Sequence, residues 1–125
     1  MIALDASAFL AFLFREKGHE RVAAILNQAC LSTVNLAEVV GRFVLDGHDV
    51  EPVLQRLTAT PLEIVPFGQA DATLAVSLLP RTRRLGLSLG DRACLALAMA
   101  RGIPALTADR SWLKLDLELE IEVIR

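Results

Sequence analysis

The sequence predicts a single α/β domain in which a mainly parallel β-sheet lies between two layers of helices. Short apolar segments of strand length alternate along the chain with longer segments of helical periodicity, a pattern typical of parallel sheets covered on both faces. The chain has 125 residues, close to the common size of one domain, and 54% of them are hydrophobic, which is ample for a buried core. We therefore expect residues 1–125 to form one α/β/α sandwich without an internal linker or repeat.

Five short segments are predicted as strands because they are apolar or rich in β-branched residues and are bounded by turn or helix-start residues. They span residues 2–4, 30–33, 63–66, 105–107 and 121–124. In a doubly wound sheet, the order 3-2-1-4-5 makes strands one and four neighbours at the switch point, and ligands bind outside the carboxyl ends of the strands there. We expect this order, with functional residues at that edge.

The helical segments begin and end at recognisable signals. Asp49, followed by Pro52, marks a helix start, Gly47 ends the preceding helix, and a further helix is expected to stop before Pro80. Residues 81–86 are expected to form a basic loop. The predicted helices span 5–14, 22–29, 34–46, a segment that starts at 49, 69–79 and 87–100, followed by a short turn at 109–113.

The composition narrows the functional classes. The net charge of −2 argues against a simple nucleic-acid-binding module, which is normally basic, but not against an enzyme whose bound metal supplies positive charge. Cys30 and Cys94 lack the spacing of zinc ligands and are expected to be small buried hydrophobic residues. Because neither a signal peptide nor an apolar run of about 18 residues is present, we expect a cytoplasmic protein without a membrane span.

Four acidic residues lie where strands end or helices begin: Asp5, Glu38, Asp91 and Asp109. Asp5 ends strand one and Asp109 follows strand four, so we expect these two to face each other, with the other two acids at the same edge of the sheet. Like charges disfavour joint ionisation, so such a cluster needs a compensating cation, and hard divalent metals take oxygen ligands. The pattern therefore indicates a metal-dependent phosphodiesterase.

Three of these acids have a structural explanation that the sequence leaves open. Asp5 and Asp109 stand where helix N-caps are common, although Ser7 is an alternative cap for the first helix. Glu38 is spaced to form a solvated i,i+4 ion pair with Arg42. Each residue taken singly is explained as well by local structure as by chemistry, and only the joint arrangement favours a functional site.

The start of the 87–100 helix combines a capping signal with a weak helix former. Asp91 lies three residues after Ser88, which is a capping-box arrangement. Gly90 stands between them and is expected to loosen this helix start, since glycine costs roughly 0.5–1 kcal/mol relative to alanine in a helix. Asp91 is thus either a capping residue or a member of the acidic cluster.

Four stretches of the chain resemble the four motifs of the PIN-domain ribonucleases, and the small VapC-type toxins of bacterial toxin–antitoxin pairs most closely. They are Ile2-Ala-Leu-Asp-Ala-Ser7, Ser32-Thr-Val-Asn-Leu-Ala-Glu-Val39, residues 87–98 and Leu106-Thr-Ala-Asp-Arg-Ser-Trp112. Any one of these motifs is a weak signal, but together they occur in the family's order and spacing over essentially the whole chain.

The resemblance implies an endoribonuclease that hydrolyses RNA phosphodiester bonds with Mg²⁺ or Mn²⁺. Asp5, Glu38, Asp91 and Asp109 match the acidic positions of the family, and Ser7 and Thr107 match its small hydroxyl positions near the metal. We expect the three aspartates to hold one or two metal ions, directly or through water, and the glutamate to orient the attacking water. The expected fold is PIN-like, in agreement with the α/β/α pattern.

The resemblance also implies partners. The toxins of this family usually form homodimers and are held inactive by a small antitoxin that inserts into the cleft, and transfer RNA is the family-level expectation for the substrate. The residues that contact RNA are unknown, and the candidates are Arg81, Arg83, Arg84, Arg92 and Arg110.

Two other functions compete with a ribonuclease. The first alternative is a PIN-like protein-interaction module without catalytic activity, against which all four acids argue. The second is a metal-dependent small-molecule phosphatase, which is disfavoured because such enzymes often carry Asp-x-Asp after the first strand, and Ser7 takes the place of the second aspartate here.

Overall fold

A computed structural model of the chain describes all 125 residues and contains a five-stranded sheet. The strands are β1 (Ile2–Leu4), β2 (Ala29–Ser32), β3 (Glu63–Val65), β4 (Ala105–Thr107) and β5 (Ile121–Val123). Every neighbouring pair is parallel, and the order is β3-β2-β1-β4-β5, which confirms the predicted topology. The switch point therefore lies between β1 and β4, where the first acidic motif meets the last.

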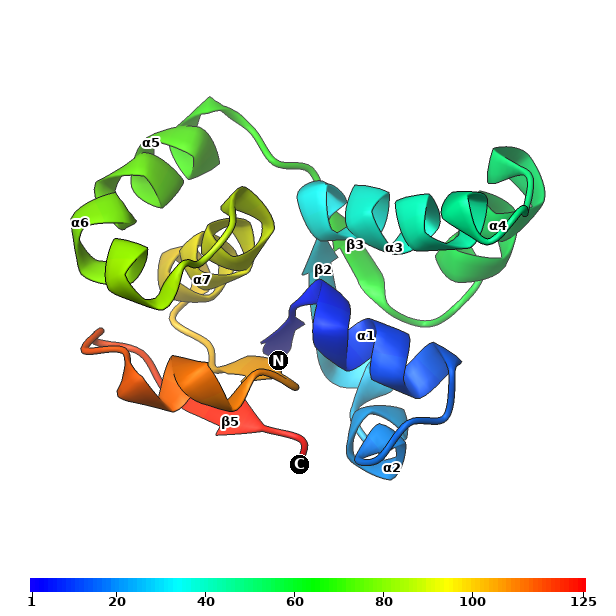
Figure 1. Cartoon of the computed structure of the whole chain (residues 1–125), viewed down its shortest axis with the longest axis horizontal. Coiled ribbons are helices and arrows are strands. Elements are labelled where there is room, and N and C mark those ends of the chain that lie inside the picture. Colours follow the sequence, from blue (N-terminus) through cyan, green and yellow to red (C-terminus); the bar gives the residue numbers. More distant parts are fainter.

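Helices cover both faces of the sheet (Figure 1). One layer contains α1 (Ala6–Leu13), α2 (His19–Ala23), α3 (Thr33–Leu45) and α4 (Val50–Thr58), and the other contains α5 (Gln69–Ser77), α6 (Leu79–Thr82) and α7 (Leu89–Arg101). Three short 3₁₀ segments complete the chain, η1 (Leu26–Gln28), η2 (Arg83–Leu85) and η3 (Arg110–Lys114). The arrangement confirms the predicted α/β/α class. None of the helices combines the length and the hydropathy that crossing a lipid bilayer requires.

The alternation of side chains along the strands separates two hydrophobic cores. Leu4 and Leu31 point into the core beneath α1–α4, where complete burial of one leucine contributes about 1.5–3 kcal/mol. Ala3, Cys30 and Ala105 point to the opposite face, beneath α7. These three small residues stand side by side, because Ala3 pairs with both of the others in the parallel ladder. They let α7 pack closely on the centre of the sheet, which places its N-terminus at the edge that carries the acids.

Two predictions for the helices differ from the structure. The helix expected over 22–29 ends at Ala23, and after a turn the chain continues as the 3₁₀ segment η1 until Ala29 pairs with β1 as the first residue of β2. The helix expected over 69–79 ends before Pro80 as predicted, at Ser77, but Pro80 itself lies in the first turn of a further helix, α6, where its missing N–H group is not needed. The basic segment after it is therefore largely helical and not a loop.

The C-terminal residues fasten the edge of the sheet to the connection between α1 and α2. The Ile124 amide donates to the Thr107 carbonyl at 3.0 Å, and the Arg125 guanidinium donates to the Lys17 carbonyl at 3.0 Å. Gly18 lies against this tail, with φ of 93° and with the Ile124 carbonyl oxygen 2.5 Å from the position that a Cβ atom would occupy. Only glycine fits there, both because of its backbone conformation and because of the space.

We expect Gly18→Ala to destabilise the protein by roughly 2–3 kcal/mol, since it combines the cost of a left-handed conformation with a displacement of the tail. Gly47→Ala is the matched control, because Gly47 has φ of 96° but open space around its missing side chain. Urea unfolding of both variants measures the difference, which reports the contact with the tail alone. Equal losses of stability in the two variants would show that the tail does not constrain Gly18.

Candidate active site

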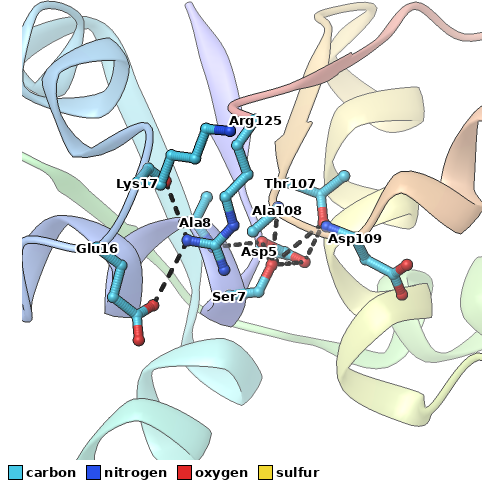
Figure 2. A network of polar contacts seen from close by, with 9 residues as sticks. All are labelled: Asp5, Ser7, Ala8, Glu16, Lys17, Thr107, Ala108, Asp109 and Arg125. Carbon is cyan, nitrogen blue, oxygen red and sulfur yellow. Dashed lines mark hydrogen bonds and ion pairs between the residues drawn. The ribbon is translucent and has the colours of Figure 1, made fainter.

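The carboxylate of Asp5 is buried at the carboxyl end of β1 and is held by three neutral donors (Figure 2). Its side chain is 2% exposed, and Oδ1 accepts a hydrogen bond of 2.8 Å from the Ala8 amide, so Asp5 itself caps α1 and the alternative cap, Ser7, does not. The Ser7 hydroxyl lies 2.8 Å from both carboxylate oxygens, and the Thr107 hydroxyl donates to Oδ2 at 2.6 Å. The two hydroxyl positions expected near the metal thus contact Asp5 directly.

Backbone amides fix the two hydroxyl groups in this orientation. The Ser7 Oγ accepts from the Ala108 amide at 2.9 Å, and the Thr107 Oγ1 accepts from the Asp109 amide at 3.0 Å. Because each oxygen already accepts an N–H group, its own proton is free to point at Asp5. The network crosses the switch point and ties β1 and α1 to the residues after β4.

Asp5 carries a charge that no cation in the chain balances. Burial raises the pKa of its carboxyl group to about 6 from an ordinary value of 3.8, although the hydrogen bonds from Thr107, Ala8 and Ser7 lower it, and the negative charge of Asp91 raises it further. None of the ion pairs in the structure includes Asp5. A buried carboxylate with only neutral donors is poised to take either a proton or a metal ion.

Asp91 lies at the start of α7 and also acts as a capping residue. Its Oδ2 accepts from the Ser88 amide at 2.9 Å, and its own amide donates to the Ser88 hydroxyl at 3.2 Å, which completes the predicted capping box. Its Oδ1 atom has no partner in the chain. Burial, followed by the charges of Asp5, Cys30, Asp91 and Glu38, raises the pKa of the Cys94 thiol well above its ordinary value. The charges of three of the four acids therefore act on the same residue of α7.

Glu38 does not form the solvated pair with Arg42 that was its structural alternative, because Arg42 pairs instead with Asp46 at 3.5 Å. Glu38 Oε1 accepts at 2.9 Å from the Nδ2 of Asn35, a residue that is 1% exposed. The same nitrogen donates to the Gly90 carbonyl at 3.0 Å, so Glu38 is linked to the start of α7. No role for Asn35 is predicted from the sequence, although its position three residues before an acid on the same helix is a usable signal.

The expected face-to-face arrangement of Asp5 and Asp109 is not observed. The Asp109 carboxylate points away from Asp5 in Figure 2, and its Oδ1 accepts from the Ser111 amide at 2.9 Å, as the N-cap of η3. Thr107 takes its place beside Asp5, because the Asp109 amide is held by the Thr107 hydroxyl and the chain turns outward there. Asp109 is connected to the site through its backbone and keeps an exposed carboxylate.

The donor set fits a hard divalent cation, but the acids do not form a closed cage. No three acidic, histidine or cysteine side chains stand close enough together to enclose an ion. None of the four surface hollows includes any of the four acids, and the acids differ in exposure, since Asp5 is buried whereas Glu38 and Asp109 are exposed. Magnesium commonly uses one or two carboxylates and completes its shell with water, and Asp5 with Asp91 is the pair that suits such binding.

The five candidate arginines have no carboxylate partners. Arg92, next to Asp91, reaches α5 and donates to the Ala75 carbonyl at 3.2 Å, which indicates a packing role. Arg110 donates to the Arg125 carbonyl at 3.0 Å, beside the end of β5. Arg83 and Arg84 are exposed on η2. The other candidate arginines are thus exposed, and only Arg92 packs against the interior of the protein.

We expect the metal-free protein to lose stability as the pH rises through the pKa of Asp5. The folded state favours the protonated acid, so the stabilisation is complete below pH 3.8 and disappears as the pH passes about 6. The difference between these values corresponds to about 3 kcal/mol. Asp5→Asn, which keeps the helix cap without the charge, should therefore be more stable than the wild type at pH 7.5 in chelator, with an advantage that shrinks toward pH 4.

Chemical denaturation at several pH values measures this difference in the free energy of unfolding. Asp116→Asn is the matched control, because Asp116 is an exposed aspartate outside the acidic cluster. A pH dependence that is the same in Asp5→Asn as in the wild type would show that the buried carboxylate does not carry the predicted cost.

Comparisons with known proteins identify the family of this chain. The PIN domain family matches residues 2–117. Among curated proteins, no sequence matches the chain. DNA-bound VapBC from Salmonella typhimurium has a similar structure, with a TM-score of 0.72 and 15% identity over 99% of this chain and 98% of that chain.

Two further solved structures share the fold. A toxin–antitoxin complex from Klebsiella pneumoniae has a TM-score of 0.70 and 18% identity over 90% of each chain. VapBC-5 from Mycobacterium tuberculosis, a member of the VapBC family of toxin–antitoxin systems, has a TM-score of 0.60 and 22% identity over 98% of this chain and 96% of that chain. At these identities the likeness shows the fold, whereas the match over residues 2–117 shows the family. The chain therefore belongs to the PIN domain family.

Proposed function

We propose that this chain is a metal-dependent endoribonuclease and the toxin of a toxin–antitoxin pair. PIN domains are generally nucleases and usually use divalent metal ions, and the family match covers residues 2–117. The observation that carries the proposal is the buried Asp5 carboxylate, which has three neutral donors and no cation, at an edge that it shares with Asp91 and Glu38.

In the proposed reaction, the residues of the site have different roles in phosphodiester hydrolysis. Asp5 and Asp91, with Asp109 on the outer side, would hold Mg²⁺ or Mn²⁺, directly or through water. When bound, the ion supplies the positive charge that balances the phosphate and the negative charge that develops as the P–O bond breaks. Ser7 and Thr107 hold the Asp5 carboxylate in a fixed orientation, so little reorganisation is needed when substrate arrives.

Glu38 is the candidate general base of the reaction. Its carboxylate is on the exposed side of α3, linked to the start of α7 through Asn35, and its Oε2 atom has no hydrogen-bond partner in the chain. In the proposed reaction it orients the attacking water and accepts its proton, a contribution that typically amounts to about 10²–10⁴-fold in rate. The substrate is RNA, and transfer RNA is the first candidate class to test.

The proposed partners are a second copy of this chain and a small antitoxin protein. The support for an antitoxin is that the similar structures include toxin–antitoxin complexes. Apolar side chains exposed on the helices supply surface for association, among them Phe14, Val44, Leu45, Val50, Val76, Leu79 and Leu89. Light scattering of the purified chain separates a dimer from a monomer, and a monomer at micromolar concentration would contradict the dimer.

We expect the purified protein to cleave total cellular RNA with Mg²⁺ or Mn²⁺ and to be inactive in chelator, with cut ends that map to a limited set of sites. Asp91→Asn should lower the cleavage rate by about 10²-fold or more, because it removes charge from the metal site. The asparagine oxygen can still accept the Ser88 amide, so the helix cap and the fold are expected to remain.

Asp116→Asn again serves as the control and should cleave at the wild-type rate. Cleavage that persists in chelator would contradict the metal mechanism, and an Asp91→Asn variant of unchanged activity would contradict the site. A folded wild-type protein that cleaves no RNA under any of these conditions would favour the alternative, a PIN-like interaction module without turnover.

A further inference from the structure

Gly90 lies at the second position of α7, where a helix does not require glycine. Its backbone conformation is open to any residue, because its φ lies outside the left-handed region, unlike that of Gly18. The space beside it is the constraint. A Cβ atom at Gly90 would overlap the carboxylate of Glu38, with Oε2 only 2.5 Å away and Oε1 closer still. The glycine that was expected to loosen the start of this helix is thus the residue of α7 against which Glu38 of α3 packs.

Asn35 completes this contact from the other side. It is buried, and its Nδ2 donates both to Glu38 Oε1 at 2.9 Å and to the Gly90 carbonyl at 3.0 Å. Its own Oδ1 is buried without a partner. A reversed amide would place that oxygen against two other oxygens, so the requirement for both donors fixes the orientation. Asn35 therefore acts as a donor that joins a side chain of α3 to the backbone of α7.

We propose that Asn35 and Gly90 are positioning residues, which seat the Glu38 carboxylate against the first turn of α7, one residue from Asp91. This inference rests on the proposed function, because the seat matters for catalysis only if Glu38 acts on the substrate. Without the seat, a glutamate on the exposed face of a helix samples several rotamers, and its carboxylate is not held near the scissile phosphate. Neither residue contacts the substrate in this proposal.

The first test is Gly90→Ala, with Gly41→Ala as the matched control. Both glycines lie inside helices, but a Cβ at Gly41 meets nothing within 4 Å. The far end of Glu38 is flexible, so Gly90→Ala is expected to swing the carboxylate out of its seat without unfolding the protein. We expect kcat for RNA cleavage to fall by about 10²-fold with KM within twofold, whereas Gly41→Ala stays within twofold of the wild type.

A double-mutant cycle separates this effect from a general disturbance of α7. In a Glu38→Asp background the side chain is one methylene shorter and leaves room for the new Cβ. Gly90→Ala should then cost no more than about twofold, so the two substitutions are strongly non-additive. Asn35→Ala removes the hydrogen bond that Glu38 receives from its own helix, α3, and should also lower kcat. This second variant tests the proposal even if Gly90→Ala does not fold.

The side-chain amide of Asn35 reports the seat without any cleavage assay. Its two N–H protons are held by Glu38 and Gly90, so in NMR spectra they should exchange slowly with water in the wild type and in Gly41→Ala. In Gly90→Ala the proton that faces Glu38 should shift and exchange faster. An Asn35 amide signal that is unchanged in Gly90→Ala would overturn the proposal that Gly90 leaves the space in which the Glu38 carboxylate is held.

The two kinds of failure are distinguishable. If the Asn35 signal changes in Gly90→Ala while RNA cleavage stays at the wild-type rate, the positioning role is overturned although the chain is a nuclease. If the signal changes and the wild-type protein itself cleaves no RNA, the proposed function is overturned, and with it the catalytic purpose of the seat. Additive effects of Gly90→Ala and Glu38→Asp on kcat would likewise overturn the proposal.

Discussion

The buried carboxylate of Asp5 is the constraint on which both the fold and the chemistry of this protein depend. It caps α1 through the Ala8 amide, and through Thr107 it joins the central strand to its neighbour β4. The same burial that makes it a structural anchor raises its pKa to about 6, because no cation offsets the loss of solvent. The fold thus maintains a charge that it does not itself neutralise, and it does so at the edge where parallel sheets bind ligands.

The other acids combine structural and chemical roles in a similar way. Asp91 closes a capping box and Asp109 caps η3, so both carboxylates lie at helix starts, where the helix dipole favours negative charge. This arrangement lets an acidic rim fold without a bound cation. The structural explanations therefore do not compete with the functional one, since a cap uses one oxygen of each of these two carboxylates and leaves the other free.

The sequence predicted the strand order, because apolar periodicity and the rules of parallel sheets determine which strand ends meet, but it placed the Asp109 carboxylate opposite Asp5, where it does not lie. It did not predict Asn35 and Gly90 as a unit, since their contact joins two helices that are distant in the chain. The direction of the Asp109 side chain depends on a local backbone turn that no pattern reports. The helix predicted over 22–29 is interrupted after Ala23 and continues only as the short segment η1, a local break that apolar spacing does not report.

Calorimetric titration of the metal-free protein with Mn²⁺ at neutral pH measures whether the acidic edge is a metal site. We expect saturable binding that Asp5→Asn weakens by about 10-fold or more, because the buried carboxylate is the group that most lacks a cation. Asp116→Asn should bind Mn²⁺ like the wild type. Absence of binding to the wild type, or equal binding to Asp5→Asn, would contradict the claim that this acidic edge is a metal site.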